Sequence, residues 1–222
     1  MKKIAVILCG SGYRDGSEIR EAVATLWSLS QEHAQFQCFA PDAPQADVIN
    51  CLTGENMTSE RRNMLVESAR IARGEVKPIT QLNVSEFDAV ILPGGFGAAK
   101  NLCDFASKGN HGTVRPDLEK ILHAFFENKK PIGAICIAPA ILALALRGKN
   151  LSLTVGAAGE TAEEIEKCGH RHVATKVTDC HIDSQNKIVT TGAYMFGSAP
   201  LHDIFAGIQK CVQGVLKLTH GY

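Results

Sequence analysis

Cys136 is the residue of this chain whose type and setting are best suited to chemistry. It lies between residues 132–135, which read as a short apolar strand, and residues 139–146, which read as an apolar helix. A cysteine at such a sharp strand-to-helix turn stands above the carboxyl edge of a sheet, in the arrangement called a nucleophile elbow. The N-terminus of the following helix favours thiolate over thiol. The alternative interpretation is a buried structural cysteine at a strand end.

A carboxylate and two glycines are expected beside Cys136. In a parallel sheet, the loops that follow the first strand, the strand at 87–92 and the elbow strand open at one edge, which brings Glu18, Gly94 and Gly95 near the sulfur. A glutamate within hydrogen-bonding reach of a thiol can share one proton with it and act as its acid/base. Taken alone, Glu18 has another role as a helix-capping carboxylate, with Asp15 as the reciprocal cap.

The glycines predict an oxyanion site. Gly94 and Gly95 have no side chains, so a substrate can approach their backbone N–H groups, and the N–H of Ile137 follows the cysteine directly. We therefore predict Cys136 and Glu18 as the catalytic pair, with Gly94, Gly95 and Ile137 binding the substrate oxygen.

Two glycine-rich stretches resemble nucleotide-binding motifs. GSGYRDG at 10–16 gives GxGxxxG between a strand and a helix, which is a variant of the dinucleotide fingerprint and does not account for Cys136. GGFGAAKN at 94–101 approaches a P-loop, but Ala99 and Asn101 stand where a glycine and a hydroxyl residue are required. We expect no cofactor.

The histidines predict no metal site. His170 and His172 alternate on a possible strand but have no third ligand at a convincing spacing, and His181 with Asp183 lies on a predicted hairpin away from the elbow.

The elements that must position these residues follow an α/β order. An apolar run at 3–9, an amphipathic helix at 17–31 and a strand at 36–40 form a βαβ opening, which indicates a mostly parallel sheet. The helix would cover the sheet with a stripe that contains Ile19, Ala22, Val23, Leu26 and Leu29. Further strands are expected at 76–79, 87–92, 151–155 and in a hairpin of 181–183 and 187–190. Further helices are expected at 98–106, 116–128, 161–168 and from 201 onward.

The segment from about 42 to 74 departs from this order, and we interpret it as an insertion in a single domain of residues 1–222. It ends in a predicted helix at 59–73 that carries Arg61, Arg62, Arg70 and Arg73, which are expected to form a solvated face.

Composition narrows the class of partner. Lys plus Arg and Asp plus Glu both total 23, so charge gives no case for nucleic acid or an anionic membrane. No apolar run approaches the length of a membrane span. Eight scattered cysteines without a CxxC motif or a secretory leader predict a reducing compartment. Small molecules or proteins are the expected partners.

At the level of whole motifs, the chain resembles the ElbB family, glyoxalase-like members of the PfpI superfamily within the class I glutamine amidotransferase-like fold. The motifs are GSGYRDGSEI at 10–19, LPGGFGAAKNL at 92–102, GAICIAP at 133–139 and KIVTTGAYM at 187–195. The resemblance implies a flavodoxin-like αβα sandwich, a homodimer and a cytoplasmic or organellar setting, of which we predict cytoplasmic. It matches the family's cysteine to Cys136, its acid to Glu18 and its Gly-Gly turn to Gly94 and Gly95.

This resemblance implies an enzyme that converts small dicarbonyls such as glyoxal and methylglyoxal to hydroxy acids without glutathione. Residues 154–157 contain no histidine where many superfamily members have one. A catalytic dyad is therefore expected rather than a triad. Neither peptidase activity nor glutamine hydrolysis is expected. The rival hypothesis is a cysteine-based redox sensor or stress-response module. An interaction partner in isoprenoid biosynthesis is suggested by the family's name alone.

Overall fold

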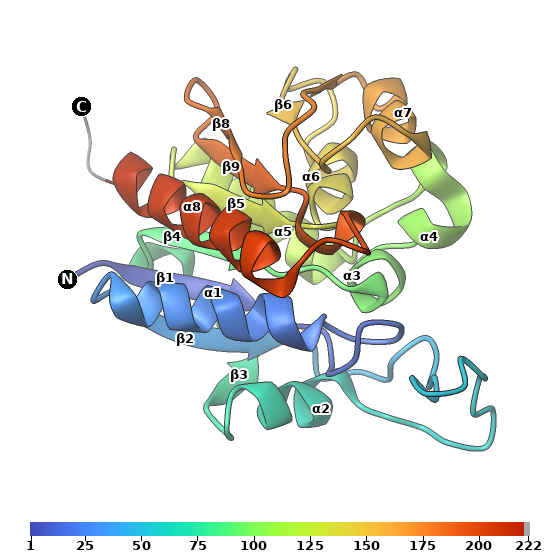
Figure 1. Ribbon diagram of the computed structural model, residues 1–222. Helices are drawn as coiled ribbons and strands as arrows, with labels where there is room; N and C mark the ends of the chain where they lie inside the picture. Colours follow the sequence, from blue (N-terminus) through green and yellow to red (C-terminus); the bar gives the residue numbers. More distant parts are fainter. Residues whose placement is uncertain (220–222) are drawn as a thin grey trace.

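A seven-stranded sheet forms the centre of the computed structural model, which describes residues 1–219 (Figure 1). Its strand order is β3-β2-β1-β4-β5-β9-β8, and all neighbours are parallel except β8 and β9. The strands are β1 (Lys3–Ile7), β2 (Gln35–Ala40), β3 (Val76–Pro78), β4 (Ala89–Leu92), β5 (Ile132–Ile135), β8 (His181–Asp183) and β9 (Ile188–Thr191). The predicted mostly parallel sheet is confirmed, and its four central strands are almost entirely buried.

Helices cover both faces of this sheet, as expected of an αβα sandwich. Helices α1 (Ile19–Gln31) and α8 (Leu201–Thr219) lie side by side on one face, and α5 (Pro116–Glu127) and α6 (Pro139–Ala145) lie behind the sheet (Figure 1). Two hydrophobic cores result, one on each side of the strands. Because β1, β4 and β5 are parallel neighbours, their carboxyl ends meet at one edge of the molecule.

Shorter elements complete the chain. They are α2 (Met64–Ile71), α3 (Phe96–Asn101), α4 (Phe105–Lys108) and α7 (Glu160–Lys167), with a two-stranded parallel sheet of β6 (Ser152–Leu153) and β7 (Arg171–His172). Single 3-10 turns lie at Ile79–Gln81, Val84–Glu86, Gly109–His111 and Ala193–Met195. The helix predicted at 59–73 is shorter than expected, and α2 connects β2 to β3, so irregular backbone is concentrated in residues 41–63.

Helix α1 packs through a different face from the one predicted. Ala22 and Leu29 are buried, but Ile19 and Val23 of the expected stripe are 46% and 45% exposed. The buried face carries small and polar residues instead, namely Glu21, Ala24, Thr25 and Ser28. Close packing of α1 against α8 accounts for this, because small side chains let two helices approach.

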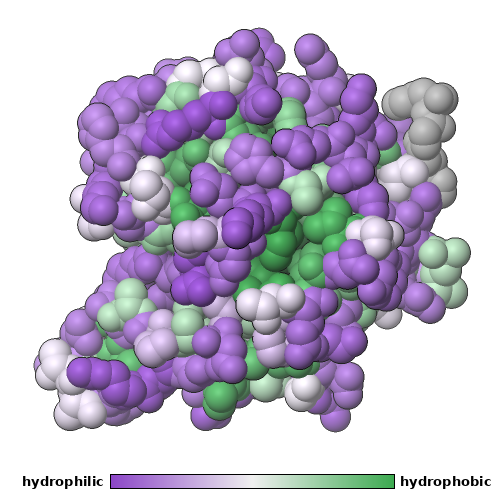
Figure 2. All heavy atoms as spheres, turned by 180° about the vertical axis from the view of Figure 1, so that it is seen from behind, coloured by the Kyte–Doolittle hydropathy of each residue, from purple (hydrophilic) through white to green (hydrophobic). Residues whose placement is uncertain are grey.

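The surface seen from behind is hydrophilic over most of its area, with hydrophobic residues gathered in a hollow near the centre (Figure 2). Within residues 1–219, no helix combines the length and the apolar character that crossing a membrane requires.

Candidate active site

Cys136 lies at the turn between β5 and α6, where the sequence predicts a nucleophile elbow. Its backbone has φ 62°, a left-handed conformation that is costly for a residue with a side chain. Its N–H donates to the carbonyl of Thr191 on β9 at 2.8 Å, which fixes the turn to the neighbouring strand. A strained backbone conformation of this kind persists only where the surrounding contacts hold it in place. Such positions are typical of functional sites.

Glu21 is the carboxyl group that lies against Cys136. It comes from the first turn of α1 and is fully buried. Its Oε2 accepts from the N–H of Gly94 at 3.0 Å and its Oε1 accepts from the N–H of Tyr194 at 3.1 Å. These two bonds aim the carboxyl group at the thiol, within hydrogen-bonding reach of the sulfur.

The contact predicted for Glu18 is therefore made by Glu21. Glu18 is the N-cap of α1, and its Oε2 accepts from the N–H of Glu21 at 2.6 Å, which is the capping role that the sequence left open. Asp15 is not the reciprocal cap, because its Oδ2 accepts from the N–H of Ile49 at 2.8 Å. The helix begins two residues later than predicted, so the side chain that faces the elbow is one turn further along.

The predicted oxyanion donors divide into two roles. The N–H groups of Gly95 and Ile137 lie at the sulfur, where they favour negative charge. The N–H of Gly94 is already bonded to Glu21 and is not free for a substrate. A side chain at Gly94 would place its Cβ 2.6 Å from Cβ of Cys136 and 2.7 Å from Oε2 of Glu21, so this position requires glycine for space.

Burial controls the ionisation of this pair. It raises the pKa of Glu21 to about 8, with a further increase from the nearby charge of Glu18. Burial and then the charge of Glu21 hold the pKa of Cys136 well above its ordinary value. Two adjacent acidic groups that cannot both ionise share their protons, so the pair carries at most one negative charge near neutral pH. The low pKa expected for Cys136 from the elbow alone is not found.

A cavity of about 720 Å³ opens next to the elbow, with Phe96 and Ile137 in its lining. Ala99 and Phe105 extend its apolar part, and Asn110, His111, Thr161, Glu164 and Lys167 contribute polar atoms. Cys136 itself is only 7% exposed and is not among the residues that line this cavity.

The histidines of the sequence analysis lie elsewhere. His170 is buried and bonds Leu151 and Ala143, while Nε2 of His181 is 2.7 Å from Oγ of Ser152 on the small sheet. No group of three or more His, Cys, Asp or Glu side chains suited to a metal ion occurs within residues 1–219.

The sheet order, the elbow and the carboxyl group of the first helix together define a class I glutamine amidotransferase-like protein. The chain belongs to the DJ-1/PfpI family, whose model matches residues 5–195. It is 45% identical to the human protein "Glutamine amidotransferase-like class 1 domain-containing protein 3, mitochondrial", over 98% of this chain and 83% of that protein. It is 32% identical to "ES1 protein, mitochondrial" of Danio rerio, over 97% of this chain and 86% of that protein.

Solved structures agree on the fold. An isoprenoid biosynthesis protein with an amidotransferase-like domain from Ehrlichia chaffeensis superposes with a TM-score of 0.90 at 38% identity, covering 97% of this chain and 99% of that one. DJ-1beta of Drosophila melanogaster, at 19% identity, shares the fold with a TM-score of 0.52 over 97% of this chain and 96% of that one.

The buried carboxyl predicts a pH dependence of stability. Glu21 has a folded-state pKa of about 8, raised from 4.5, so the folded protein retains a proton that the unfolded chain loses first. The free energy of unfolding should therefore fall as pH rises from 5 to 7.5, by up to about 1.4 kcal/mol per unit. Urea unfolding across this range measures it. Glu21→Gln should flatten the slope, and an equal slope in that variant would contradict the assignment.

Proposed function

We propose that this protein is a glutathione-independent glyoxalase-type enzyme of the ElbB kind, acting on small dicarbonyls. The observation that carries the proposal is the convergence on one sulfur of a buried carboxyl group and two backbone N–H groups. Such a set supplies a nucleophile, a proton carrier and a site for developing negative charge on oxygen. The site fits a reaction that needs no other reactant than water.

The proposed reaction begins when the Cys136 sulfur adds to the aldehyde carbon of R–CO–CHO. The thiol proton passes through Glu21 to the new oxygen, which gives a hemithioacetal. Glu21 then removes the hydrogen from the hemithioacetal carbon, which gives an enediol, and returns a proton to the neighbouring carbon. The hydroxyl proton on the first carbon passes to the oxygen of the second, so that the former ketone becomes an alcohol and the former aldehyde a thioester. Water cleaves the thioester to a 2-hydroxy acid and restores the thiol. The N–H groups of Gly95 and Ile137 are suited to hold the transient oxyanion.

The depth of the sulfur supports a small substrate. A residue exposed by only 7% admits a two- or three-carbon aldehyde more readily than a peptide bond. Any larger R group would extend into the cavity lined by Phe96 and Ile137.

A cysteine-based redox sensor is the second candidate, and the site favours it less. Such a sensor needs an accessible thiol with a lowered pKa, whereas burial raises the pKa of Cys136.

As for the cellular location, two similar proteins are named mitochondrial, and we propose a reducing compartment, the cytoplasm or the interior of an organelle.

Replacement of the nucleophile tests the proposal directly. Cys136→Ser should reduce kcat/KM for methylglyoxal at least a thousandfold, or about 4 kcal/mol, because a buried hydroxyl is a far weaker nucleophile. Cys51→Ser is the matched control, since Cys51 is exposed, and should leave turnover unchanged. Hydroxy-acid formation followed by NMR gives the rates. Turnover of the Cys136 variant at the wild-type level would overturn the mechanism.

The two glutamates should separate by function. Glu21→Gln should lower kcat by about 10²–10⁴-fold, because it removes the proton carrier. Glu18→Gln removes a charge that raises the pKa of Glu21, so it should keep most activity and move the pH–rate profile to lower pH. Profiles of kcat/KM between pH 5 and 9 measure both effects. An inactive Glu18 variant beside an active Glu21 variant would reverse the assignment.

We also propose the homodimer that the resemblance implies. Ile19, Val23 and Trp27 recur at helical spacing on α1 and are 46%, 45% and 48% exposed, which makes an apolar stripe that a second copy could cover. Sedimentation equilibrium should give twice 23.8 kDa for the wild type. Trp27→Glu should shift it towards monomer, and Leu52→Glu, at an exposed apolar site outside the stripe, should not. A monomeric wild type would contradict this proposal.

A further inference from the structure

Two sequence features that the proposed reaction does not use converge in the structure. A cavity of about 560 Å³ is lined by Ser11, Glu60, Arg61, Arg62, Glu67 and Arg70. Ser11 belongs to the glycine-rich loop at 10–16, and the three arginines belong to the segment that the sequence predicts to be a solvated charged face. They surround one cavity, and Cys136 is not part of its lining.

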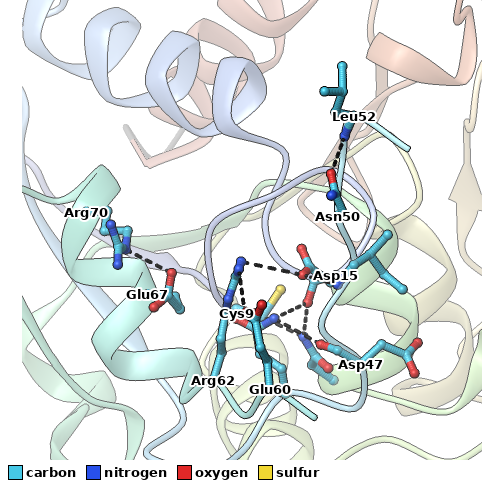
Figure 3. A network of polar contacts seen from close by, with 12 residues as sticks. Cys9, Asp15, Asp47, Asn50, Leu52, Glu60, Arg62, Glu67 and Arg70 are labelled. Carbon is cyan, nitrogen blue, oxygen red and sulfur yellow. Dashed lines mark hydrogen bonds and ion pairs between the residues drawn. The ribbon is translucent and has the colours of Figure 1, made fainter. Parts of the chain in front are cut away.

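The arginines are held in place by their neighbours. Arg70 pairs with Glu67 at 2.8 Å through Nε, and Arg62 pairs with Glu60 at 3.2 Å through Nη2. Figure 3 shows these two pairs on opposite sides of the space, with Arg62 also directed at the buried Asp15. Each pair uses part of a guanidinium, which has five N–H donors, so further N–H groups of Arg62 and Arg70 remain for a ligand.

Arg61 differs from the other two arginines in its partners. Its Nη1 donates to the carbonyl oxygens of Thr58 and Glu60 at 2.9 and 2.8 Å, and no carboxylate pairs with it in the part of the chain that the structure describes. Glu60, Glu67 and Asp15 together balance the charge of the three arginines, and Arg61 is the one that makes no ion pair within residues 1–219. An anion that binds here would thus meet three guanidinium groups, one of which has no carboxylate partner to compete with it.

We propose that this cavity binds the phosphoryl group of a small phosphorylated metabolite, at a site separate from Cys136. Guanidinium groups bind phosphate oxygens through paired, charge-assisted hydrogen bonds. Three guanidinium groups around one space are better matched to a doubly charged phosphoryl ligand than to a ligand with a single carboxylate. The volume of about 560 Å³ exceeds what one anion fills, so there is room for the organic part of the ligand. The hydroxyl of Ser11 is a further donor at the same cavity.

Glycerol 3-phosphate, titrated into the full chain at constant ionic strength, tests this site by calorimetry and by amide chemical shifts. Arg61→Gln and Arg70→Gln should each weaken binding about tenfold, because each removes charge-assisted hydrogen bonds. Arg73→Gln is the matched control, with the same charge change in the same segment but outside the cavity. Cys136→Ser should bind like the wild type, which keeps this site independent of the proposed reaction.

Inorganic phosphate and acetate form the comparison arms. Tighter binding of glycerol 3-phosphate than of inorganic phosphate supports a ligand with an organic body, and equal binding supports the phosphoryl group alone. Acetate binding as tightly as either phosphate would overturn the proposal, as would a failure of both phosphates to bind. Equal weakening by Arg73→Gln and Arg61→Gln would also overturn it, because the effect would then be one of overall charge. The amide spectrum of each variant verifies that it is folded.

Discussion

The burial of the Glu21 carboxyl group is the constraint on which the site depends. Removing such a group from water is costly unless hydrogen bonds replace the hydration, and here the donors come from Gly94 after β4 and Tyr194 after β9. The carboxyl group itself comes from α1, which follows β1. Three segments far apart in the sequence must therefore meet at the Glu21 side chain. Cys136, after β5, comes from a fourth segment and contacts the same carboxyl group.

That meeting explains why the turn after β4 consists of glycines. Gly94 has room only for a hydrogen where a Cβ would contact Cys136 and Glu21. Gly95 has φ 100°, and a Cβ there would lie 2.4 Å from the backbone N of Glu18. The N–H of Glu18 in turn donates to the carbonyl of Gly94 at 2.9 Å. The two glycines are thus required for close packing of the first helix against the elbow, whether or not a substrate binds there.

The sequence predicted the scaffold better than the partner of the cysteine. Strand runs such as Ile132–Ile135 and the elbow are local patterns, and both are present. Which face of α1 is buried depends on α8, which lies at least 170 residues further along the chain, and the apolar stripe indicated the wrong face. The sequence did contain a signal for the buried face. Glu21, Thr25 and Ser28 share one face of the helix. A charged residue with small polar neighbours on one face is compatible with close helix packing around a functional group.

The coupled ionisation of Glu21 and Cys136 changes how the elbow can form a nucleophile. For an isolated buried cysteine, burial opposes the thiolate and would make the sulfur inert. Here the thiol with an ionised Glu21 and the thiolate with a protonated Glu21 carry the same net charge, so moving the proton from sulfur to the carboxylate adds no charge to the buried site. The N–H groups of Gly95 and Ile137 stabilise charge on sulfur, as those of Gly94 and Tyr194 stabilise charge on Glu21. In the proposed reaction, the nucleophile arises by proton transfer within the pair when a carbonyl carbon is present to accept the sulfur, without a permanently exposed thiolate that oxidants could attack.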